Sequence, residues 1–244
     1  MPLAEEITEM SNMSKLFELD SRLKLCADYV RNGTTLADIG TDHAYLPVWL
    51  ALKSKIKSAL ACDIRPMPLQ SGADNIEKYG CSDVVKTRLS DGLDEIKENE
   101  ADDIVLAGMG GELIVNIIAR TEWLKNHDKH LIMQPMTKAF VLREYLCRNG
   151  FDIVEEKACT YGGKNYSVML AVYDAEERNY PESYYYCGKL EEKDPYVKPY
   201  IKQVIKKLNY KAEGKRHCGE KNIAEEKIID ELRNKFGVDE DDNR

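Results

Sequence analysis

One twelve-residue stretch, LADIGTDHAYLP at positions 36–47, constrains the fold of this chain more than any other part of it. It starts as an apolar strand, turns at Gly40 and continues as an apolar helix. In an open α/β sheet such a turn lies at the carboxyl end of a strand, where these sheets bind ligands. Asp63 closes the next apolar run, 23 residues after Gly40. An acidic residue at that spacing accepts hydrogen bonds from ribose hydroxyls, so the pattern indicates a nucleoside-containing ligand.

The turn differs from a dinucleotide fingerprint. The G-x-G-x-x-G pattern would need glycine at positions 42 and 45, which hold Asp42 and Tyr45. The carboxylate of Asp42 would repel a pyrophosphate. S-adenosylmethionine fits better, because it carries a sulfonium, an ammonium and a ribose but no phosphate. We expect Asp38 to bind the ammonium, directly or through water, and Asp42 to cap the following helix.

Strand and helix patterns alternate along the chain, which predicts a parallel sheet with helices on both faces. An amphipathic helix is expected from Leu16 to Gly33, and later helices after each of the first, second, fourth and fifth strands. The two last strands are joined too briefly for a crossover helix, so we expect an antiparallel pair at the sheet edge. The expected strands are Thr34–Gly40, Lys57–Asp63, Val84–Ser90, Asp103–Ala107, His130–Met133, Phe151–Cys159 and Ser167–Tyr173, and the helices that follow four of them are Tyr45–Lys53, Pro66–Tyr79, one ending at Arg120 and one ending at Arg148.

Further polar and glycine-rich pieces follow the later strands. Asp91-Gly92 either forms a plain turn or places the Asp91 carboxylate to accept a hydrogen bond from the adenine amine. The glycines of residues 108–111 (GMGG) serve either tight helix–sheet packing or close approach of a substrate to the backbone. Gln134-Pro135-Met136 is either a simple loop or a source of an amide donor and acceptor. His43 is a structural histidine or lies near the reacting group, and the sequence leaves both interpretations open.

The C-terminal part has a different composition. Four tyrosines crowd a loop around Pro181, and two apolar stripes then predict an antiparallel helical hairpin. The stripes comprise Ile201, Val204, Ile205, Leu208 and Ala212 in the first helix and Ile223, Ile228, Ile229, Leu232 and Phe236 in the second.

The hairpin is basic although the chain is acidic. Residues 189–216 hold nine Lys and Arg against four Asp and Glu, while the whole chain has a net charge of -8. Lysines recur every fourth residue at 198, 202 and 206 and at 207, 211 and 215, which places each set on one helix face. Such a face is either solvated helix surface or a surface that follows RNA phosphates.

Composition limits the remaining possibilities. The seven cysteines are scattered without a C-x-x-C pair, which predicts reduced thiols in a cytoplasmic protein and no metal site. The N-terminus is acidic and lacks the apolar core of a signal peptide. No apolar run approaches the ~20 residues of a membrane span, so no membrane association is expected.

The quoted motifs, together with Ser21-Arg22-Leu23 and Tyr161-Gly162-Gly163-Lys164-Asn165-Tyr166, resemble those of the bacterial tRNA (adenine(22)-N1)-methyltransferases. The resemblance runs from about residue 16 to the hairpin. It implies a Rossmann-like class I methyltransferase sheet, with an antiparallel edge strand, followed by a coiled-coil-like hairpin. We therefore expect a disordered extension at 1–12, a cofactor-binding methyltransferase domain at 13–178, a tRNA-contacting hairpin at 179–238 and an acidic tail at 239–244.

The resemblance also implies S-adenosylmethionine as methyl donor, tRNA as partner and N1 of adenine as acceptor. Arg22 would then lie near the carboxylate of the cofactor. The expected cofactor-binding residues are Arg22, Asp38, Gly40, Asp42, His43, Asp63, Ile64, Asp91, Gly92, Gly108, Met109 and Gly110. The expected substrate-binding residues are Gly111, Pro135, Met136, Tyr161, Lys202 and Lys206, and the expected catalytic residues are Gln134, His43 and Tyr166.

The hypothesis for the reaction needs no strong base, because the lone pair of adenine N1 attacks the methyl group directly. Gln134 or the backbone of Gly108-Met109 would hold the N6 amine, and Tyr161 or Tyr166 would stack on the base. Two other functions stay open: a methyltransferase for a small molecule or protein that dimerises through the hairpin, and a nucleotide sensor without catalysis. For the tRNA enzyme we expect a monomer.

Overall fold

The computed structural model describes residues 17–218 and 221–239. The predicted extension at residues 1–12 and the tail from residue 240 onward lie outside the described residues. The elements in chain order are α2 (Ser21–Tyr29), β1 (Thr34–Ile39), α3 (Tyr45–Leu52), β2 (Ile56–Asp63), α4 (Pro66–Lys78), β3 (Val85–Leu89), η1 (Glu98–Glu100), β4 (Asp103–Gly110), α5 (Gly111–Ala119), η2 (Glu122–Leu124), β5 (His130–Thr137), α6 (Ala139–Arg148), β6 (Phe151–Tyr161), β7 (Lys164–Tyr173), α7 (Glu182–Cys187), α8 (Val197–His217) and α9 (Ile223–Phe236).

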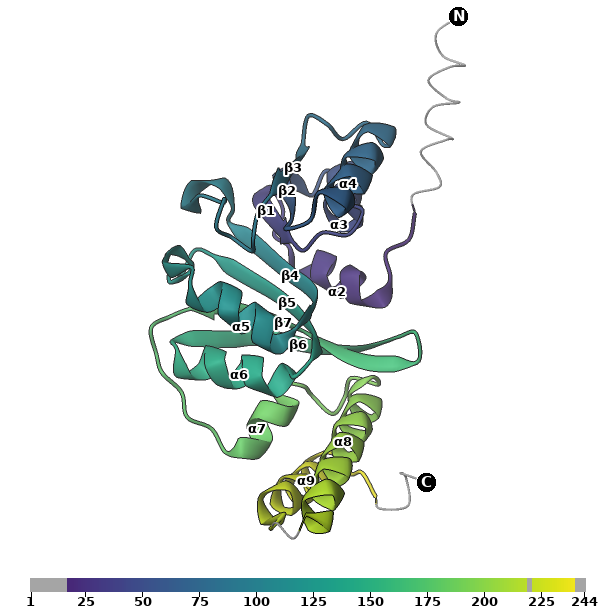
Figure 1. Cartoon of the computed structure of the whole chain (residues 1–244), viewed down its shortest axis with the longest axis vertical. Helices are drawn as coiled ribbons and strands as arrows, with labels where there is room; N and C mark the ends of the chain where they lie inside the picture. The colour runs from purple at the N-terminus through teal and green to yellow at the C-terminus, as the bar shows by residue number, and fades with distance from the viewer. Residues whose placement is uncertain (1–16, 219–220, 240–244) are drawn as a thin grey trace, which may run out of the picture.

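A seven-stranded sheet with the order β3-β2-β1-β4-β5-β7-β6 forms the centre of the molecule (Figure 1). The first five strands in chain order are parallel, as the alternating pattern predicted. The predicted antiparallel pair is confirmed, because β7 runs antiparallel to both β5 and β6. The reversed strand β7 lies one position in from the edge, and β6 forms the edge itself.

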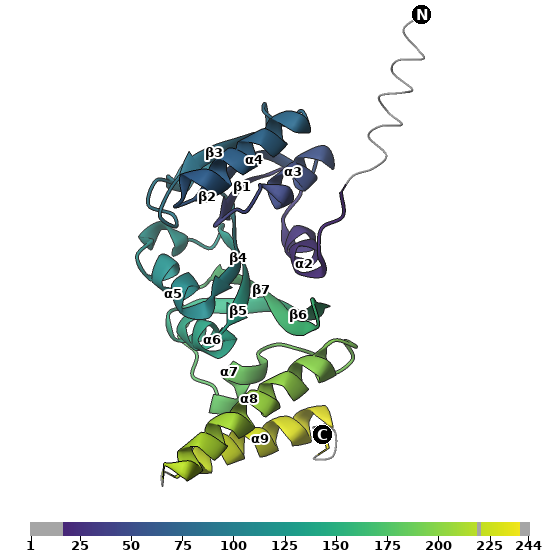
Figure 2. The ribbon, with the colours of Figure 1, turned by 45° about the vertical axis from the view of Figure 1, so that its right-hand side comes forward.

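Side chains alternate between the two faces of the sheet and build two separate cores. Ile104 and Leu106 of β4 pack with α5 and α6 on one face, whereas Val105 between them packs with α2, α3 and α4 on the other. Figure 2 shows the two helical layers on opposite sides of the sheet. Both faces are covered, which is why the central strands are almost continuously apolar.

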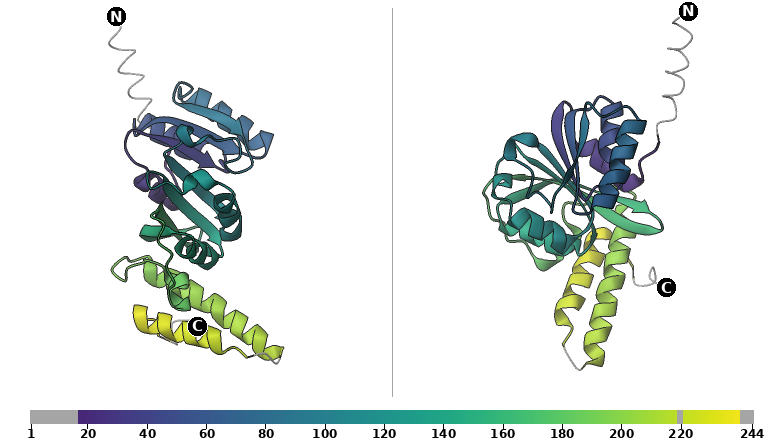
Figure 3. Two further views of the ribbon diagram at one scale, coloured as in Figure 1. Left: turned by 90° about the vertical axis from the view of Figure 1, so that its left-hand side faces the viewer. Right: turned by 45° about the horizontal axis from the view of Figure 1, so that its top comes forward.

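The hairpin of α8 and α9 projects away from the sheet and forms a third core with part of α7 (Figure 3). Four of the five residues predicted in the second stripe are buried; Ile223, the first residue of α9, is 64% exposed instead. The segment around the four tyrosines, expected as a loop, contains the short helix α7.

Several strands extend further than the sequence predicted, including β6, which ends at Tyr161, and β7, which begins at Lys164. β4 continues through Gly108 to Gly110 and β5 continues through Gln134 to Thr137, because the pieces expected as loops pair with each other across a register shift. The opening helix is shorter than expected: α2 begins at Ser21, where Asp20 accepts from the backbone N–H groups of Arg22 and Leu23. The domain boundaries at residues 178 and 238 stay predictions.

Candidate functional site

Most of the residues predicted to bind the cofactor lie at the carboxyl ends of β1, β2, β3 and β4, around the position where β1 and β4 lie side by side. The strand order reverses there: β2 and β3 follow β1 on one side of the sheet, and β5 follows β4 on the other. Open α/β sheets bind ligands at such a switch point because the loops diverge and leave a crevice.

Gly40 and Met109 bring the two strands of the switch point into contact. Gly40 has a φ of 73°, in the left-handed region that favours glycine. A Cβ atom at this position would lie 2.6 Å from Cε of Met109. Both features require glycine here, so the turn and the tip of β4 form one surface.

The turn after Gly40 is strained at two further residues. His43 and Ala44 have φ values of 62° and 53°, although neither is glycine. Residues held in this region cost about 1–3 kcal/mol each and gather at functional sites. Nδ2 of Asn75 in α4 donates to the carbonyl of His43 at 2.9 Å, which helps hold the turn.

Asp42 does not cap α3, contrary to the prediction. The N-cap residue is Ala44, which makes no side-chain capping hydrogen bond. The carboxylate of Asp42 is exposed, and its Oδ1 lies 3.5 Å from Nε2 of His43. The His43 ring in turn stacks on Tyr45, with 5.4 Å between ring centroids.

Asp38 is the most unusual carboxylate of this edge. It lies in β1, is 6% exposed and makes no ion pair within residues 17–218 and 221–239. Burial raises the pKa of Asp38 to about 6. A buried carboxylate without a cation is costly, and a ligand that brings a positive charge relieves that cost.

Two more aspartates follow the neighbouring strands. Asp63 ends β2, and its Oδ1 accepts from the backbone N–H of Arg65 at 2.8 Å. The next residue, Ile64, is 59% exposed and offers an apolar surface beside it. Asp91 follows β3 and pairs through Oδ1 with Arg120 at 2.7 Å, and Arg120 also contacts Asp94 at 3.1 Å.

The sequence analysis missed Arg120, which holds the loop after β3 from the end of α5. No local pattern marks it, because 29 residues separate Arg120 from Asp91. Gly92 fits this contact closely: a Cβ there would meet Arg120 Nη2 at 2.9 Å.

Gln134 lies wholly inside the molecule, with 0% exposure. Its Oε1 accepts from the backbone N–H of Gly108 at 3.1 Å, and its Nε2 donates to the carbonyl of Pro135 at 3.2 Å. The side chain therefore holds the irregular end of β4 against β5. The predicted contact between Gln134 and the base stays a prediction.

Arg22, Met136 and the two tyrosines of the β6–β7 hairpin, Tyr161 and Tyr166, come together from three distant parts of the sequence. The Arg22 guanidinium lies 4.4 Å from the ring centroid of Tyr161 and 5.5 Å from that of Tyr166. Its Nη1 lies 3.1 Å from Sδ of Met136. Asp20, which the sequence analysis did not select, accepts from Arg22 Nη2 at 2.8 Å and fixes the guanidinium. The structure thus brings together one cation and two aromatic rings beside the end of β5.

The two predicted lysine faces of α8 differ in the structure. Lys211 and Lys215 both pair with the buried Glu225 of α9, at 2.9 and 2.7 Å. Burial alone would raise the pKa of Glu225, but the hydrogen bonds from Lys215 and Lys211 hold it at about 2. These two lysines therefore join the helices of the hairpin, while Lys206 is exposed and Lys202 half-buried.

No group of three or more His, Cys, Asp or Glu side chains that could hold a metal ion occurs in the described part of the chain. Within the same residues, none of the helices has the length and apolar character to cross a membrane.

Comparison with known proteins agrees with this geometry. Residues 19–169 match the family model described as a methyltransferase domain, so the chain belongs to that family of methyltransferases. A solved structure of a putative tRNA (m1A22) methyltransferase from Streptococcus pneumoniae is 30% identical, covers 88% of this chain and 99% of that chain, and has a TM-score of 0.77. Within the methyltransferases, this chain belongs to the tRNA (adenine(22)-N(1))-methyltransferase family.

Two further relatives come from Bacillus subtilis. The curated tRNA (adenine(22)-N(1))-methyltransferase of strain 168 is 38% identical over 154 residues, or 63% of this chain. That match covers 65% of the Bacillus protein, slightly less than two thirds of its length. The crystal structure of a B. subtilis m1A22 tRNA methyltransferase is 29% identical, covers 93% of this chain and 99% of that chain, and has a TM-score of 0.74. The S. pneumoniae protein also has a structure in complex with S-adenosyl-L-methionine.

Proposed function

We propose that this protein transfers a methyl group from S-adenosylmethionine to N1 of adenine 22 in the D-arm region of bacterial tRNA. The observation that carries the proposal is the carboxyl edge of the sheet, where a buried, unpaired carboxylate and two strand-end aspartates suit a cationic nucleoside. The relatives named for this reaction support it, since the similarity to the Streptococcus structure covers both the sheet and the hairpin regions. A tRNA substrate also implies a cytoplasmic enzyme.

The residues at the edge fit the proposed cofactor. Asp38 would hold the ammonium, because its carboxylate is buried without an ion-pair partner among the described residues, and this burial raises its pKa. Asp63 would accept from the ribose hydroxyls, and Asp91 from the adenine amine. Arg22 would neutralise the carboxylate of the methionine part. Gly40, Gly108 and Met109 would form the surface between these groups.

Bound S-adenosylmethionine supplies an electrophilic methyl group, and adenine N1 accepts it without losing a proton. The chain therefore has to orient the base and stabilise positive charge rather than supply a base catalyst. N1 lies on the Watson–Crick edge, so a paired adenine would have to leave its stack. Tyr161 and Tyr166 would then contact the exposed base beside Met136, and His43 borders the opposite side of the switch point.

Gln134 has a testable part in this arrangement. The Gln134→Ala variant removes the acceptor that Gly108 uses at the irregular end of β4. We expect a lower single-turnover rate and a smaller loss of cofactor affinity, since Gln134 supports Gly108 at the cofactor surface while the aspartates that hold the cofactor lie elsewhere. An unchanged rate would remove Gln134 from the site.

Lys202 and Lys206 of α8 would contact the tRNA backbone. Charge reversal at both residues should weaken tRNA binding, reduce its dependence on salt and leave cofactor binding unchanged. Unaltered affinity and salt dependence would exclude this face of the hairpin as an RNA-binding surface.

The proposed reaction is tested by incubating the protein with tritiated S-adenosylmethionine and unmodified bacterial tRNA, and then identifying the labelled nucleoside after digestion. Label in 1-methyladenosine is the expected result. Cofactor binding without any labelled tRNA would refute the proposal. In that case a dimeric mass in solution would favour a small-molecule or protein methyltransferase that pairs through the hairpin.

A further inference from the structure

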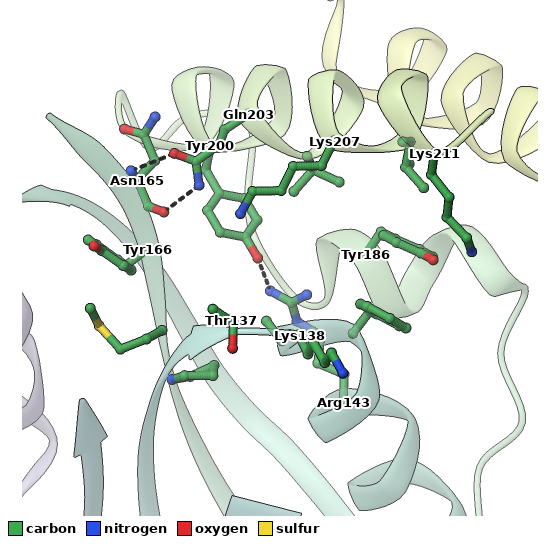
Figure 4. A pocket seen from close by; sticks show the side chains of 16 residues that line it. Thr137, Lys138, Arg143, Asn165, Tyr166, Tyr186, Tyr200, Gln203, Lys207 and Lys211 are labelled. Atoms are coloured by element: carbon green, nitrogen blue, oxygen red, sulfur yellow. Dashed lines mark hydrogen bonds between the residues drawn. The ribbon is translucent and has the colours of Figure 1, made fainter. Parts of the chain in front are cut away.

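A cavity of about 340 Å³ lies between the end of β5, strand β7 and helix α8. It sits where the sheet and the hairpin meet, and Figure 4 shows side chains from both parts turned toward it. Its volume falls in the lower part of the range of about 300–1,000 Å³ that is typical of small-ligand sites. The proposed function uses only its rim at Pro135, Met136 and Tyr166.

The walls of the cavity are aromatic on two sides. Phe140 of α6 and Tyr186 of α7 stack nearly parallel, with ring centroids 4.8 Å apart and an interplanar angle of 8°. Tyr166 of β7 lies on the opposite side of the cavity (Figure 4). Flat aromatic surfaces of this kind bind nucleobases by stacking, without a preference for one base.

The polar groups that line the cavity are cationic or neutral. No Asp or Glu occurs among its described lining residues, although the chain as a whole has a net charge of -8. Two of the lysines that line the cavity pair with glutamates that do not line it: Lys138 with Glu112 at 2.7 Å, and Lys211 with Glu225 at 2.9 Å. Lys207 extends from α8 over the cavity and has no ion-pair partner within residues 17–218 and 221–239 (Figure 4).

Position links the cavity to the methyl-transfer site. Met136 lines the cavity and also contacts Arg22, the cation placed beside the cofactor. A base at the acceptor site would therefore have the cavity as its direct neighbour on the side of the hairpin. An RNA strand that continues from that base toward the hairpin would pass the cavity.

We propose that this cavity binds a second nucleotide of the RNA, next to the adenine that is methylated. The base of that nucleotide packs between Tyr166 and the Phe140–Tyr186 pair, and its phosphate binds Lys207. The inference rests on the proposed function, because it takes the polymer to be tRNA. It adds a binding site that lies between the acceptor site and the lysines of the hairpin.

Two variants test the cavity in different ways. Val204→Trp fills it from α8, where Val204 is half-buried at the rim of the hairpin core. Lys207→Glu reverses the unpaired charge without altering the apolar packing. Lys227→Glu is the matched control, because the substitution makes the same charge change on α9. Lys227 is well exposed and does not line the cavity.

For each variant, we would measure the dissociation constant for unmodified tRNA over a range of salt concentrations, and the affinity for S-adenosylmethionine by calorimetry. Val204→Trp should weaken tRNA binding by about 5- to 150-fold, the loss expected for one stacked base. Lys207→Glu should reduce the slope of log affinity against log salt by about 0.7. Cofactor affinity should match that of the wild type in both variants.

The outcomes separate this inference from the proposed function. If the wild-type protein labels no tRNA, the proposed function falls and this inference falls with it. If the wild type labels tRNA but Lys207→Glu and Val204→Trp bind tRNA as Lys227→Glu does, only the cavity proposal is overturned. Should Val204→Trp fail to fold, as seen by circular dichroism, Lys207→Glu alone decides.

Discussion

The Glu156→Gln substitution tests how the hairpin is attached to the sheet. Glu156 of β6 and Arg143 of α6 form an ion pair in which both side chains are fully buried, with Arg143 Nη2 2.6 Å from Glu156 Oε1. The same Nη2 lies 3.0 Å from the hydroxyl of Tyr200 in α8. Gly188 is needed beside the pair, because a Cβ atom there would overlap Glu156 Oε2. The Arg143 guanidinium therefore connects the sheet, α6 and the hairpin.

The expected cost follows from leaving this cation without its counter-charge. Glu156→Gln keeps the size of the side chain but removes the negative charge, and breaking a buried pair in this way costs about 3–5 kcal/mol. For a protein of this size each kcal/mol lowers the melting temperature by about 2–4 °C. The variant should therefore melt about 6–20 °C below the wild type.

Thermal unfolding followed by circular dichroism measures this shift. Glu144→Gln is the control on α6, the helix that carries Arg143, because Glu144 pairs with Arg148 at 2.9 Å on the surface, where such pairs contribute at most about 1 kcal/mol. The double variant Arg143→Met/Glu156→Leu should recover part of the loss, since apolar residues then fill the site. A shift for Glu156→Gln no larger than that for Glu144→Gln would refute the reasoning.

Three more predictions concern the site and the hairpin. Asp38 is ionised only above its pKa of about 6, so affinity for S-adenosylmethionine should fall as the pH drops from 7 to 5, approaching a tenfold loss per pH unit. The Asp38→Asn variant should bind the cofactor more weakly, and its affinity, measured by calorimetry, should not depend on pH in this range. The Gly40→Ala substitution adds a methyl group 2.6 Å from Met109 Cε, at a residue with a φ of 73°. It should reduce cofactor affinity and lower the melting temperature by several degrees. Unchanged values of both would contradict the close contact. The pKa of Glu225 is about 2 in the folded protein, below the unfolded value near 4.3. Its contribution to stability is therefore complete above about pH 4.3 and is lost as the pH falls toward 2. In the Glu225→Gln variant, the free energy of unfolding should fall less steeply between pH 5 and pH 2.

Much of the fold could be predicted because local patterns determine it. The apolar strands, the glycine turns and the amphipathic helices gave the order of elements and the antiparallel pair of β6 and β7. The carboxyl ends of parallel strands share one edge, so Asp38, Asp63 and Asp91 could be placed together before any coordinates. The cofactor and acceptor assigned to that edge rest on its residue types and on the family.

The remaining features depend on contacts between distant residues, which periodicity cannot reveal. Arg143 reaches Tyr200 across 57 residues, and nothing near either of them in the sequence marks the contact. Lys211 looked like part of a solvated or RNA-binding face, but it turns to Glu225 of the partner helix. Asp42 had the residue type of a helix cap, yet two left-handed residues after it move the helix start to Tyr45.

The central claim is that this chain methylates adenine 22 of tRNA at N1. The most direct test compares two transcripts of one bacterial tRNA, the natural sequence and a variant with guanine at position 22, incubated with the protein and tritiated S-adenosylmethionine. The account predicts one methyl group per natural transcript, recovered as 1-methyladenosine, and none in the variant. Equal labelling of both transcripts, or label recovered in another nucleoside, would contradict it.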